Sequence, residues 1–112
     1  MKRIEAIIRP ERLEAVKASL AATGATGLTV TEVKGHGVQR GVTQQWRGRD
    51  YTVDLLPKVS IMLVVNDHEV GDVVESIASV ARTDRIGDGK IFVSSVEQVV
   101  RIRTGESGTE AL

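Results

Sequence analysis

Two short segments late in the chain carry the residue types that bind phosphate. Gly87-Asp88-Gly89-Lys90 joins two glycines, which let backbone N–H groups approach a ligand closely, to a mobile lysine cation. About ten residues later, Arg101 and Arg103 would lie on one face of a strand as fixed guanidinium forks. Taken singly, the first segment is also typical of an ordinary turn and the second of a solvated strand face. Together they predict an anion-binding site, which we call the anion cradle, whose expected ligand is a phosphate.

Hydrophobic periodicity indicates the elements that must position this cradle. We expect strands at residues 2–9, 28–34, 59–65 and 91–95, and helices at residues 10–23 and 70–80. Pro10 suits a helix start and Gly24 a helix stop, while Asn66 followed by Glu69 resembles a capping box. This order predicts a ferredoxin-like α+β sandwich, βαββαβ, with both helices on one face of an antiparallel sheet.

The opposite face of the predicted sheet is expected to be covered by other copies of the chain. Ile7, Thr29, Met62 and Val64 would lie on this face, and together they are too apolar to face water wholly. We therefore predict a closed symmetric oligomer, built from a single domain that spans residues 1–112.

Two other segments are expected to lack structure of their own. Residues 37–55 separate the second and third strands by far more than the roughly two to five residues of common hairpin connections. Ordering so polar a stretch would cost roughly tens of kcal/mol, so we expect a loop that is mobile when free and ordered by what it binds. Residues 96–103 are expected to form a short helical turn and a small added strand, and residues 104–112 to be ordered only when a ligand or partner holds them.

Composition excludes several classes of function. The 15 basic and 15 acidic residues balance to zero, which argues against a protein that mainly binds the DNA or RNA backbone. No cysteine is present, so disulfides and thiol catalysis are excluded. No stretch approaches the roughly 20 apolar residues of a membrane span. We expect a cytoplasmic, soluble protein that binds no nucleic acid and does not insert into the membrane.

Two other functions remain compatible with a ferredoxin-like domain. A small phosphate-processing enzyme similar to acylphosphatases would also place cations around phosphate, but the chain has only His36 and His68 and shows no nucleophile paired with a base. An RNA-binding module would need aromatic side chains on the sheet to stack bases, and the predicted strands offer Phe92 alone. Turnover of ATP or an acyl phosphate would support the first alternative, and salt-sensitive RNA binding the second.

Six stretches of the chain match a known family in their order and spacing. They lie at residues 2–10, 27–35, 46–51, 56–59, 85–93 and 101–106, and include the sequences GLTVTEVKG, RIGDGKIFV and RIRTGE. Over essentially its whole length the chain thus resembles the PII nitrogen-signalling proteins. The resemblance implies a non-enzymatic homotrimer of ferredoxin-like subunits that binds ATP or ADP in clefts between subunits, and 2-oxoglutarate through a Mg²⁺ ion held with the ATP.

The resemblance also implies partners. The long loop would dock onto target proteins, among them an ammonium channel, which would recruit the protein to the membrane, and nitrogen-assimilation enzymes or regulators. Arg47 matches the loop-tip arginine that enters the channel as a cationic plug, and Tyr51 matches a tyrosine that some lineages modify with a nucleotidyl group. A PII-like trimer that senses another nucleotide or a small anion is the alternative within the same fold.

Ligand-binding residues carry over from the family position by position. The implied nucleotide contacts are Ile7, Thr29, Gly35, Gly37, Val38, Met62, Val64, Gly87, Asp88, Gly89, Lys90, Arg101, Ile102 and Arg103. The phosphates would lie between residues 87–90 of one subunit and the two arginines of the next. Gln39 would ligate the Mg²⁺ and so take part in 2-oxoglutarate binding, and Lys58 would pair with the distal carboxylate of the oxo acid.

The chain departs from the family pattern in and beside the long loop. Val38 stands where many members have an arginine that contacts the terminal phosphate, which bears on the discrimination between ATP and ADP. Arg49 occupies the position of a modified serine in cyanobacterial members, so serine phosphorylation at that position is excluded. Trp46 replaces the commoner tyrosine and His36 a usual aromatic residue, and the altered loop argues against recognition of Tyr51 by a tyrosine-modifying enzyme.

Overall fold

The fold is seen in a computed structural model that describes residues 1–25, 27–36, 42–46, 49–53 and 55–112, the two segments 42–46 and 49–53 by their backbone alone. Its long elements are β1 (Lys2–Ile8), α1 (Leu13–Ala22), β2 (Thr29–Gly35), β3 (Val42–Trp46), β4 (Arg49–Val53), β5 (Leu56–Val65), α2 (Val70–Ala81) and β6 (Gly89–Ser95). Short 3-10 turns occupy Pro10–Arg12, Asp67–Glu69 and Gly108–Ala111. Among the described residues, no helix is long and apolar enough to cross a bilayer.

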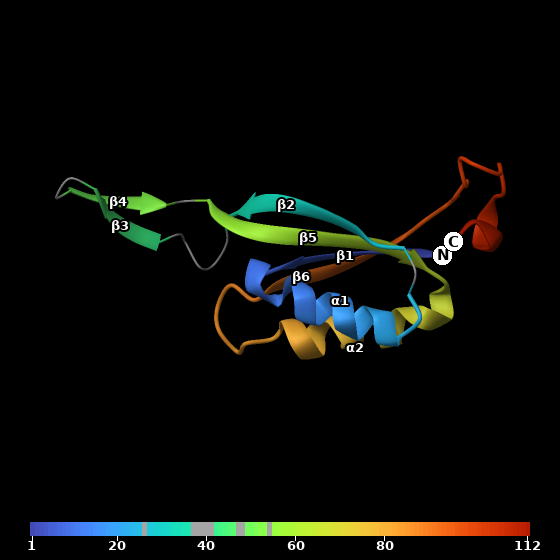
Figure 1. The fold of residues 1–112 in the computed structure, drawn as a ribbon, viewed down its shortest axis with the longest axis horizontal. Coiled ribbons are helices and arrows are strands. Elements are labelled where there is room, and N and C mark those ends of the chain that lie inside the picture. The colour runs from blue at the N-terminus through green and yellow to red at the C-terminus, as the bar shows by residue number, and fades with distance from the viewer. Residues whose placement is uncertain (26, 37–41, 47–48, 54) are drawn as a thin grey trace.

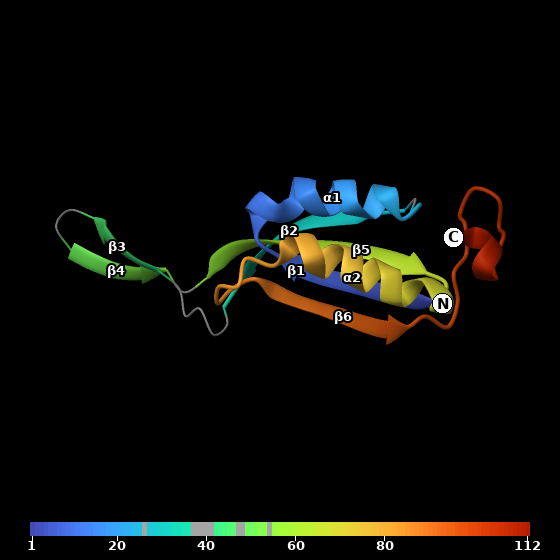
Figure 2. The same ribbon diagram turned by 90° about the horizontal axis from the view of Figure 1, so that it is seen from below.

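Four strands form an antiparallel sheet in the order β2-β5-β1-β6, and the two helices cover one of its faces (Figures 1 and 2). The ferredoxin-like βαββαβ arrangement is therefore confirmed. The third and fourth predicted strands, residues 59–65 and 91–95, correspond to β5 and β6, which begin slightly earlier in the chain. Helix α1 begins three residues after Pro10 because the proline opens a 3-10 turn first.

Alternation along the central strands decides which face holds the core. Ile4, Ala6 and Ile8 of β1 are buried beneath the helices, and the intervening residues point to the other face. The register pairs Ile4 with Leu63 and Ala6 with Ile61, so neighbouring strands add their apolar side chains to the same layer. The helices contribute five buried residues to this core: Val16, Leu20, Val73, Ile77 and Ala81.

The start of α2 matches the predicted capping box. Glu69 Oε1 accepts hydrogen bonds from the backbone N–H of Asn66 at 3.2 Å and from its side-chain amide at 2.9 Å. These bonds fix the turn between the end of β5 and the helix. At the other helix, Gly24 takes a φ of +84° just after α1, as expected of a glycine that stops a helix.

The segment between β2 and β5 differs from its prediction as a structureless loop. Strands β3 and β4 pair as an antiparallel hairpin, from Val42 opposite Val53 to Trp46 opposite Arg49, and this hairpin extends away from the main sheet (Figure 1). Pairing of the two strands gives hydrogen-bond partners to backbone N–H and C=O groups. This pairing supports a hairpin although the polar sequence offers little side-chain burial. Mobility of the free loop stays a prediction.

The prediction for residues 96–103 is wrong. In place of a helical turn and an added strand, these residues form bends and turns with a single β-bridge between Val100 and Ser107. The physical reason is local hydrogen bonding: Arg101 N–H donates to the Glu106 carbonyl and Gly105 N–H to the Arg101 carbonyl, both at 2.8 Å. Residues 104–112 fold back and end in the 3-10 turn Gly108–Ala111, and their ordering by a ligand or partner stays a prediction.

Candidate functional site

A network around Asp88 holds the predicted phosphate turn. Arg9, which is 9% exposed, donates through Nε to Asp88 Oδ1 at 3.0 Å and through Nη2 to the Ile86 carbonyl at 2.8 Å. The backbone N–H groups of Thr83 and Asp84 donate to Asp88 Oδ2 at 2.7 and 3.0 Å, and the Thr83 hydroxyl bonds to Oδ1. The Asp88 carboxylate therefore holds the conformation of the turn through hydrogen bonds within the protein.

These contacts explain the acidity of Asp88. Hydrogen bonds from Thr83, followed by those from Arg9 and Asp84, hold the pKa of the Asp88 carboxyl far below its usual range. The group is thus a carboxylate at any physiological pH, and its charge is matched by the Arg9 guanidinium. Sequence reasoning placed Asp88 among the nucleotide contacts but missed Arg9 and Thr83, which lie 79 and 5 residues from it and share no motif with it.

The two glycines of the turn are required by the backbone itself. Gly87 and Gly89 have φ angles of +101° and +107°, a region that favours glycine. A Cβ added at Gly89 would lie 1.7 Å from the carbonyl oxygen of Ile7, because β6 begins there against β1. Gly89 therefore allows the turn to enter the sheet.

Lys58 reaches the same turn from a different strand. Its Nζ donates to the Gly87 carbonyl at 2.7 Å, and Lys58 lies on β5 opposite Val33 of β2. Burial first, and then the neighbouring Arg9 cation, lower the pKa of the Lys58 ammonium, while Glu11 and Asp88 act in the opposite direction. The structure thus brings the residue predicted to bind the oxo acid directly to the turn predicted to bind phosphate.

The predicted site residues at this end of the sheet form one group, which we call the loop-end group. It consists of Ile7, Gly35, Lys58 and residues 87–90. Ile7 pairs with Lys90 in the register of β1 and β6, and Gly35 lies at the end of β2, where a Cβ would meet the Lys58 side chain at 3.3 Å. This group presents a glycine turn and two lysines but no arginine fork directed outward.

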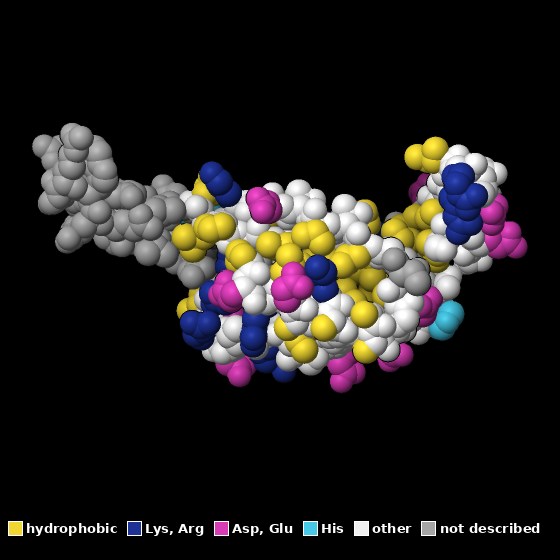
Figure 3. Space-filling model, in the orientation of Figure 1, with side chains coloured by type: hydrophobic (Ala, Val, Ile, Leu, Met, Phe, Trp, Pro, Cys, Tyr) yellow, Lys and Arg dark blue, Asp and Glu magenta, His cyan; other side chains and the backbone are white. Residues whose placement is uncertain are grey.

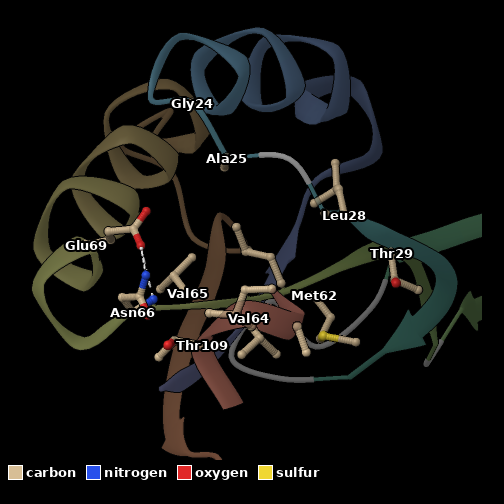
Figure 4. A pocket seen from close by; sticks show the side chains of 14 residues that line it. Gly24, Ala25, Leu28, Thr29, Met62, Val64, Val65, Asn66, Glu69 and Thr109 are labelled. Atoms are coloured by element: carbon tan, nitrogen blue, oxygen red, sulfur yellow. Dashed lines mark hydrogen bonds between the residues drawn. The ribbon is translucent and has the colours of Figure 1, made fainter. Parts of the chain in front are cut away.

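A second group lies around a cavity of about 490 Å³ at the other end of the sheet (Figure 4). Thr29 pairs with Met62 in the register of β2 and β5, and Val64 follows two residues later on the same face. All three line the cavity, together with the turn after α1 and with Thr109, Ala111 and Leu112. Figure 3 shows hydrophobic side chains between the body and the C-terminal segment. The C-terminal residues were missed by sequence reasoning.

Arg101 is directed to the C-terminal segment rather than along a strand face. Its Nη1 donates to Glu106 Oε1 at 3.3 Å, and its Nη2 donates to the carbonyl oxygens of Glu110 and Leu112 at 3.2 and 3.4 Å. The predicted strand with Arg101 and Arg103 side by side is wrong, because residues 102–104 form a turn. Arg103 is exposed, and Ile102 is 100% exposed.

The two groups lie at opposite ends of the sheet. Lys90 is the second residue of β6, and Arg101 lies beyond the end of this strand. Figure 2 shows that β6 ends beside the N-terminus, at the other end of the sheet from the long loop. At about 3.3 Å per residue, the part of β6 that follows Lys90 spans roughly 17 Å. A single chain therefore does not assemble the anion cradle that the sequence predicts, although it contains both halves.

The remaining predicted residues belong to the long loop. Gly37, Val38, Gln39 and Arg47 lie outside the described residues. Tyr51 lies on β4 opposite Gln44, where the structure describes the backbone only.

Comparisons with known proteins give one consistent result. The family model described as "Nitrogen regulatory protein P-II" matches residues 1–106. Nitrogen regulatory protein P-II 2 of Methanothermobacter thermautotrophicus is 62% identical over the whole chain and 97% of its own length. Proteins called nitrogen regulatory protein P-II from Cereibacter sphaeroides and Nostoc punctiforme are 58% and 54% identical, each over the full length of both chains.

Proposed function

Because the chain belongs to the nitrogen regulatory protein P-II family, we propose that it senses ATP or ADP in clefts between copies of itself and reports them to target proteins. The family consists of nitrogen signal proteins and not of enzymes. The cations around residues 87–90 are accordingly expected to bind a ligand rather than transform it. The proposal includes a homotrimer and a cytoplasmic location.

One observation carries the proposal: the two halves of the predicted nucleotide site lie at opposite ends of one sheet. The other half consists of Arg101 and Arg103 with the cavity residues Thr29, Met62 and Val64, which we call the tail-end residues. A contact in which the loop-end group of one copy meets the tail-end residues of the next is heterologous, and such contacts form a ring when the rotation between copies closes. Three subunits would give three equivalent sites. The open sheet face supports the packing, since Ile7, Met62 and Val64 are only partly buried there and Phe92 is 50% exposed.

Each half supplies a different part of nucleotide recognition. From one copy, Gly87, Gly89 and Lys90 would meet the phosphates with N–H groups and a cation. From the next copy, Arg101 and Arg103 would add charge-assisted hydrogen bonds, while Thr29, Met62 and Val64 would form the apolar wall against the adenine. The Asp88 carboxylate would act by holding the turn in shape, as its bonds to Arg9 and Thr83 indicate.

Lys58 and Gln39 would add the response to 2-oxoglutarate. Lys58 would pair with the distal carboxylate of the oxo acid from its position at the Gly87 carbonyl. The amide oxygen of Gln39 is a neutral, hard ligand of the kind that suits Mg²⁺. A bound Mg²⁺ would bring the ATP phosphates and the oxo acid to one point. Because Gln39 lies at the base of the long loop, ligand binding would change which loop conformers targets can select.

The long loop would carry the signal. Arg47 would act as a cationic plug in an ammonium channel at the membrane, and other targets would be nitrogen-assimilation enzymes or regulators. Tyr51 is the candidate modification site of this loop, although the altered residues around it argue against recognition by a tyrosine-modifying enzyme.

Titration calorimetry tests this function, with the oligomeric state measured alongside by analytical ultracentrifugation. We expect ATP to bind at nearly three sites per trimer, and 2-oxoglutarate to bind only when ATP and Mg²⁺ are present. A protein that stays monomeric and is indifferent to ATP and ADP would contradict the proposal. Tight binding of a different nucleotide or small anion by a trimer would replace it with the alternative sensor.

A further inference from the structure

Arg101 joins the C-terminal segment, residues 104–112, to the body of the protein. A guanidinium has two edges that can grip a phosphate through two parallel hydrogen bonds, Nε with Nη2 and Nη1 with Nη2. Both edges include Nη2. In this structure Nη2 donates to the main-chain oxygens of Glu110 and Leu112, and Nη1 donates to Glu106. Arg101 therefore cannot grip a phosphate bidentately without giving up at least one bond to the C-terminal segment.

The same segment covers the cavity that contains the predicted adenine wall. Thr109, Ala111 and Leu112 line this cavity together with Met62 and Val64, and Figure 4 shows Thr109 close to Val64. The ion pair between Arg101 and Glu106 is accessible to a competing anion, because the two side chains are 34% and 42% exposed. Partly exposed ion pairs of this sort contribute little to stability, so an incoming phosphate has only a weak competitor to displace.

We propose that Arg101 is a latch that holds either the C-terminal segment or a phosphate, but not both. This inference rests on the proposed nucleotide function. When Arg101 turns to phosphate, the segment loses its contacts to Nη2 and moves away from the cavity wall. The bound nucleotide is then reported at the C-terminal end of the chain, at the opposite end of the sheet from the long loop.

The latch has a reciprocal consequence. Because phosphate and segment compete for one side chain, a change that weakens the hold on the segment strengthens phosphate binding by up to the same factor. The segment carries a matched pair of acidic residues for testing this. The Glu106 carboxylate bonds to Arg101, whereas Glu110 bonds to Arg101 only through its backbone carbonyl, and both side chains are exposed.

Glu106→Gln and Glu110→Gln remove the same charge from the same segment, so their difference isolates the latch. We expect Glu106→Gln to bind ATP about two- to fivefold more tightly than the wild-type protein in calorimetry, as loss of a partly exposed ion pair would give. Glu110→Gln should bind ATP as the wild type does. Equal affinities of the two variants would overturn the latch. Weaker ATP binding by Glu106→Gln would also overturn it, and would show that the segment orients Arg101 for phosphate.

A fluorescent label follows the segment directly. The chain has no cysteine, so Thr109→Cys, at an exposed position on the cavity rim, gives a unique attachment point for an environment-sensitive dye. ATP should shift the emission of this label, and inorganic tripolyphosphate should shift it the same way. In the labelled Arg101→Lys variant, which lacks a fork, the emission should already be shifted before ATP is added.

The two measurements separate this inference from the proposed function. If ATP binds the wild type but leaves the label unchanged, the latch is wrong and the nucleotide function stands. If ATP does not bind but tripolyphosphate shifts the label, the latch stands and the assignment of a nucleotide is wrong. If neither ligand shifts the label and neither binds, both are overturned.

Discussion

The Lys58 ammonium donates a 2.7 Å hydrogen bond to the carbonyl oxygen of Gly87, and so joins the middle strand β5 to the glycine turn before β6. This bond places a cation that can pair with a carboxylate beside N–H groups that can bind phosphate. Two ligands bound there would be neighbours. Binding of one ligand would then change the affinity for the other, because both would contact the turn at Gly87.

Lys58→Ala should separate the two ligands. We expect the variant to lose 2-oxoglutarate binding and to keep ATP binding largely intact, because the phosphates would use Gly87, Gly89 and Lys90 instead. Calorimetry with ATP, and then with 2-oxoglutarate in the presence of ATP and Mg²⁺, measures both affinities. Lys34→Ala, an exposed lysine on β2, is the matched control and should change neither. Equal loss of both ligands in Lys58→Ala would contradict the assigned roles.

Asp88 should make stability depend on pH. Since its folded-state pKa is depressed, the Asp88 carboxylate stabilises the fold fully above its unfolded pKa of about 4, and this contribution is lost as the pH falls below that value. Asp88→Asn should therefore unfold at lower urea concentration than the wild type at pH 7, with a difference that shrinks as the pH falls from 5 toward 3. Asp72→Asn, at an exposed position on α2, should show no such trend. A difference that stays constant with pH would refute this role of the carboxylate.

Gly89→Ala should destabilise the protein strongly. The added methyl would lie 1.7 Å from the Ile7 carbonyl oxygen at a φ of +107°, so either β1 or the turn must move. A strained backbone of this kind costs about 1 to 3 kcal/mol before the clash is counted. Gly71→Ala, on α2, is the matched control, because a Cβ added at Gly71 would have no atom within 4 Å. Alanine should stabilise that helix by about 0.5 to 1 kcal/mol relative to glycine. Urea unfolding of both variants would test the contrast, which a stable Gly89→Ala would contradict.

The fold was predictable because elements buried on one side show a regular spacing of apolar residues in the sequence. Ile4, Ala6 and Ile8 alternate on β1, and Val73 and Ile77 recur at helical spacing on α2, so the pattern alone fixes which face each element buries. The hairpin of β3 and β4 was not predicted, because a polar stretch of this length lacks the apolar alternation that indicates a buried strand. The β-branched pairs Val42–Val53 and Thr43–Thr52 are a signal that could have indicated it.

The site was predictable only in part, since it depends on contacts between distant residues. The glycine turn at residues 87–90 is visible as a motif, and the structure shows it held as a turn. Arg9 could not be assigned to it, because its partner Asp88 lies 79 residues away. Arg101 was expected on a strand, whereas Gly105, with a φ of +75°, closes a turn that brings Glu106 back to it. Gly105 is itself the sequence signal for this turn, because glycine readily adopts a positive φ.

A subunit-mixing experiment would show whether two copies build one site. Lys90→Ala damages only the loop-end half of the proposed site, and Arg103→Ala only the tail-end half, without touching the bonds of Arg101 to the C-terminal segment. Each variant alone should bind ATP weakly at every site, because every junction contains one damaged half. In a mixed ring, one junction joins an intact Lys90 to an intact Arg103, and that junction should bind ATP with wild-type affinity.

The readout is the number of tight sites in protein that is unfolded and refolded as an equimolar mixture. Calorimetry should detect tight ATP binding in this mixture and none in either variant refolded alone. The reason is geometric: β6 separates Lys90 from the turn at residues 102–104, so complementation requires the halves to come from different chains. If every site were built within one chain, each chain would carry one damaged half, and mixing would restore no tight ATP binding. That result would contradict the proposal that two copies share one cleft, and the separation of the two groups would then have no functional explanation.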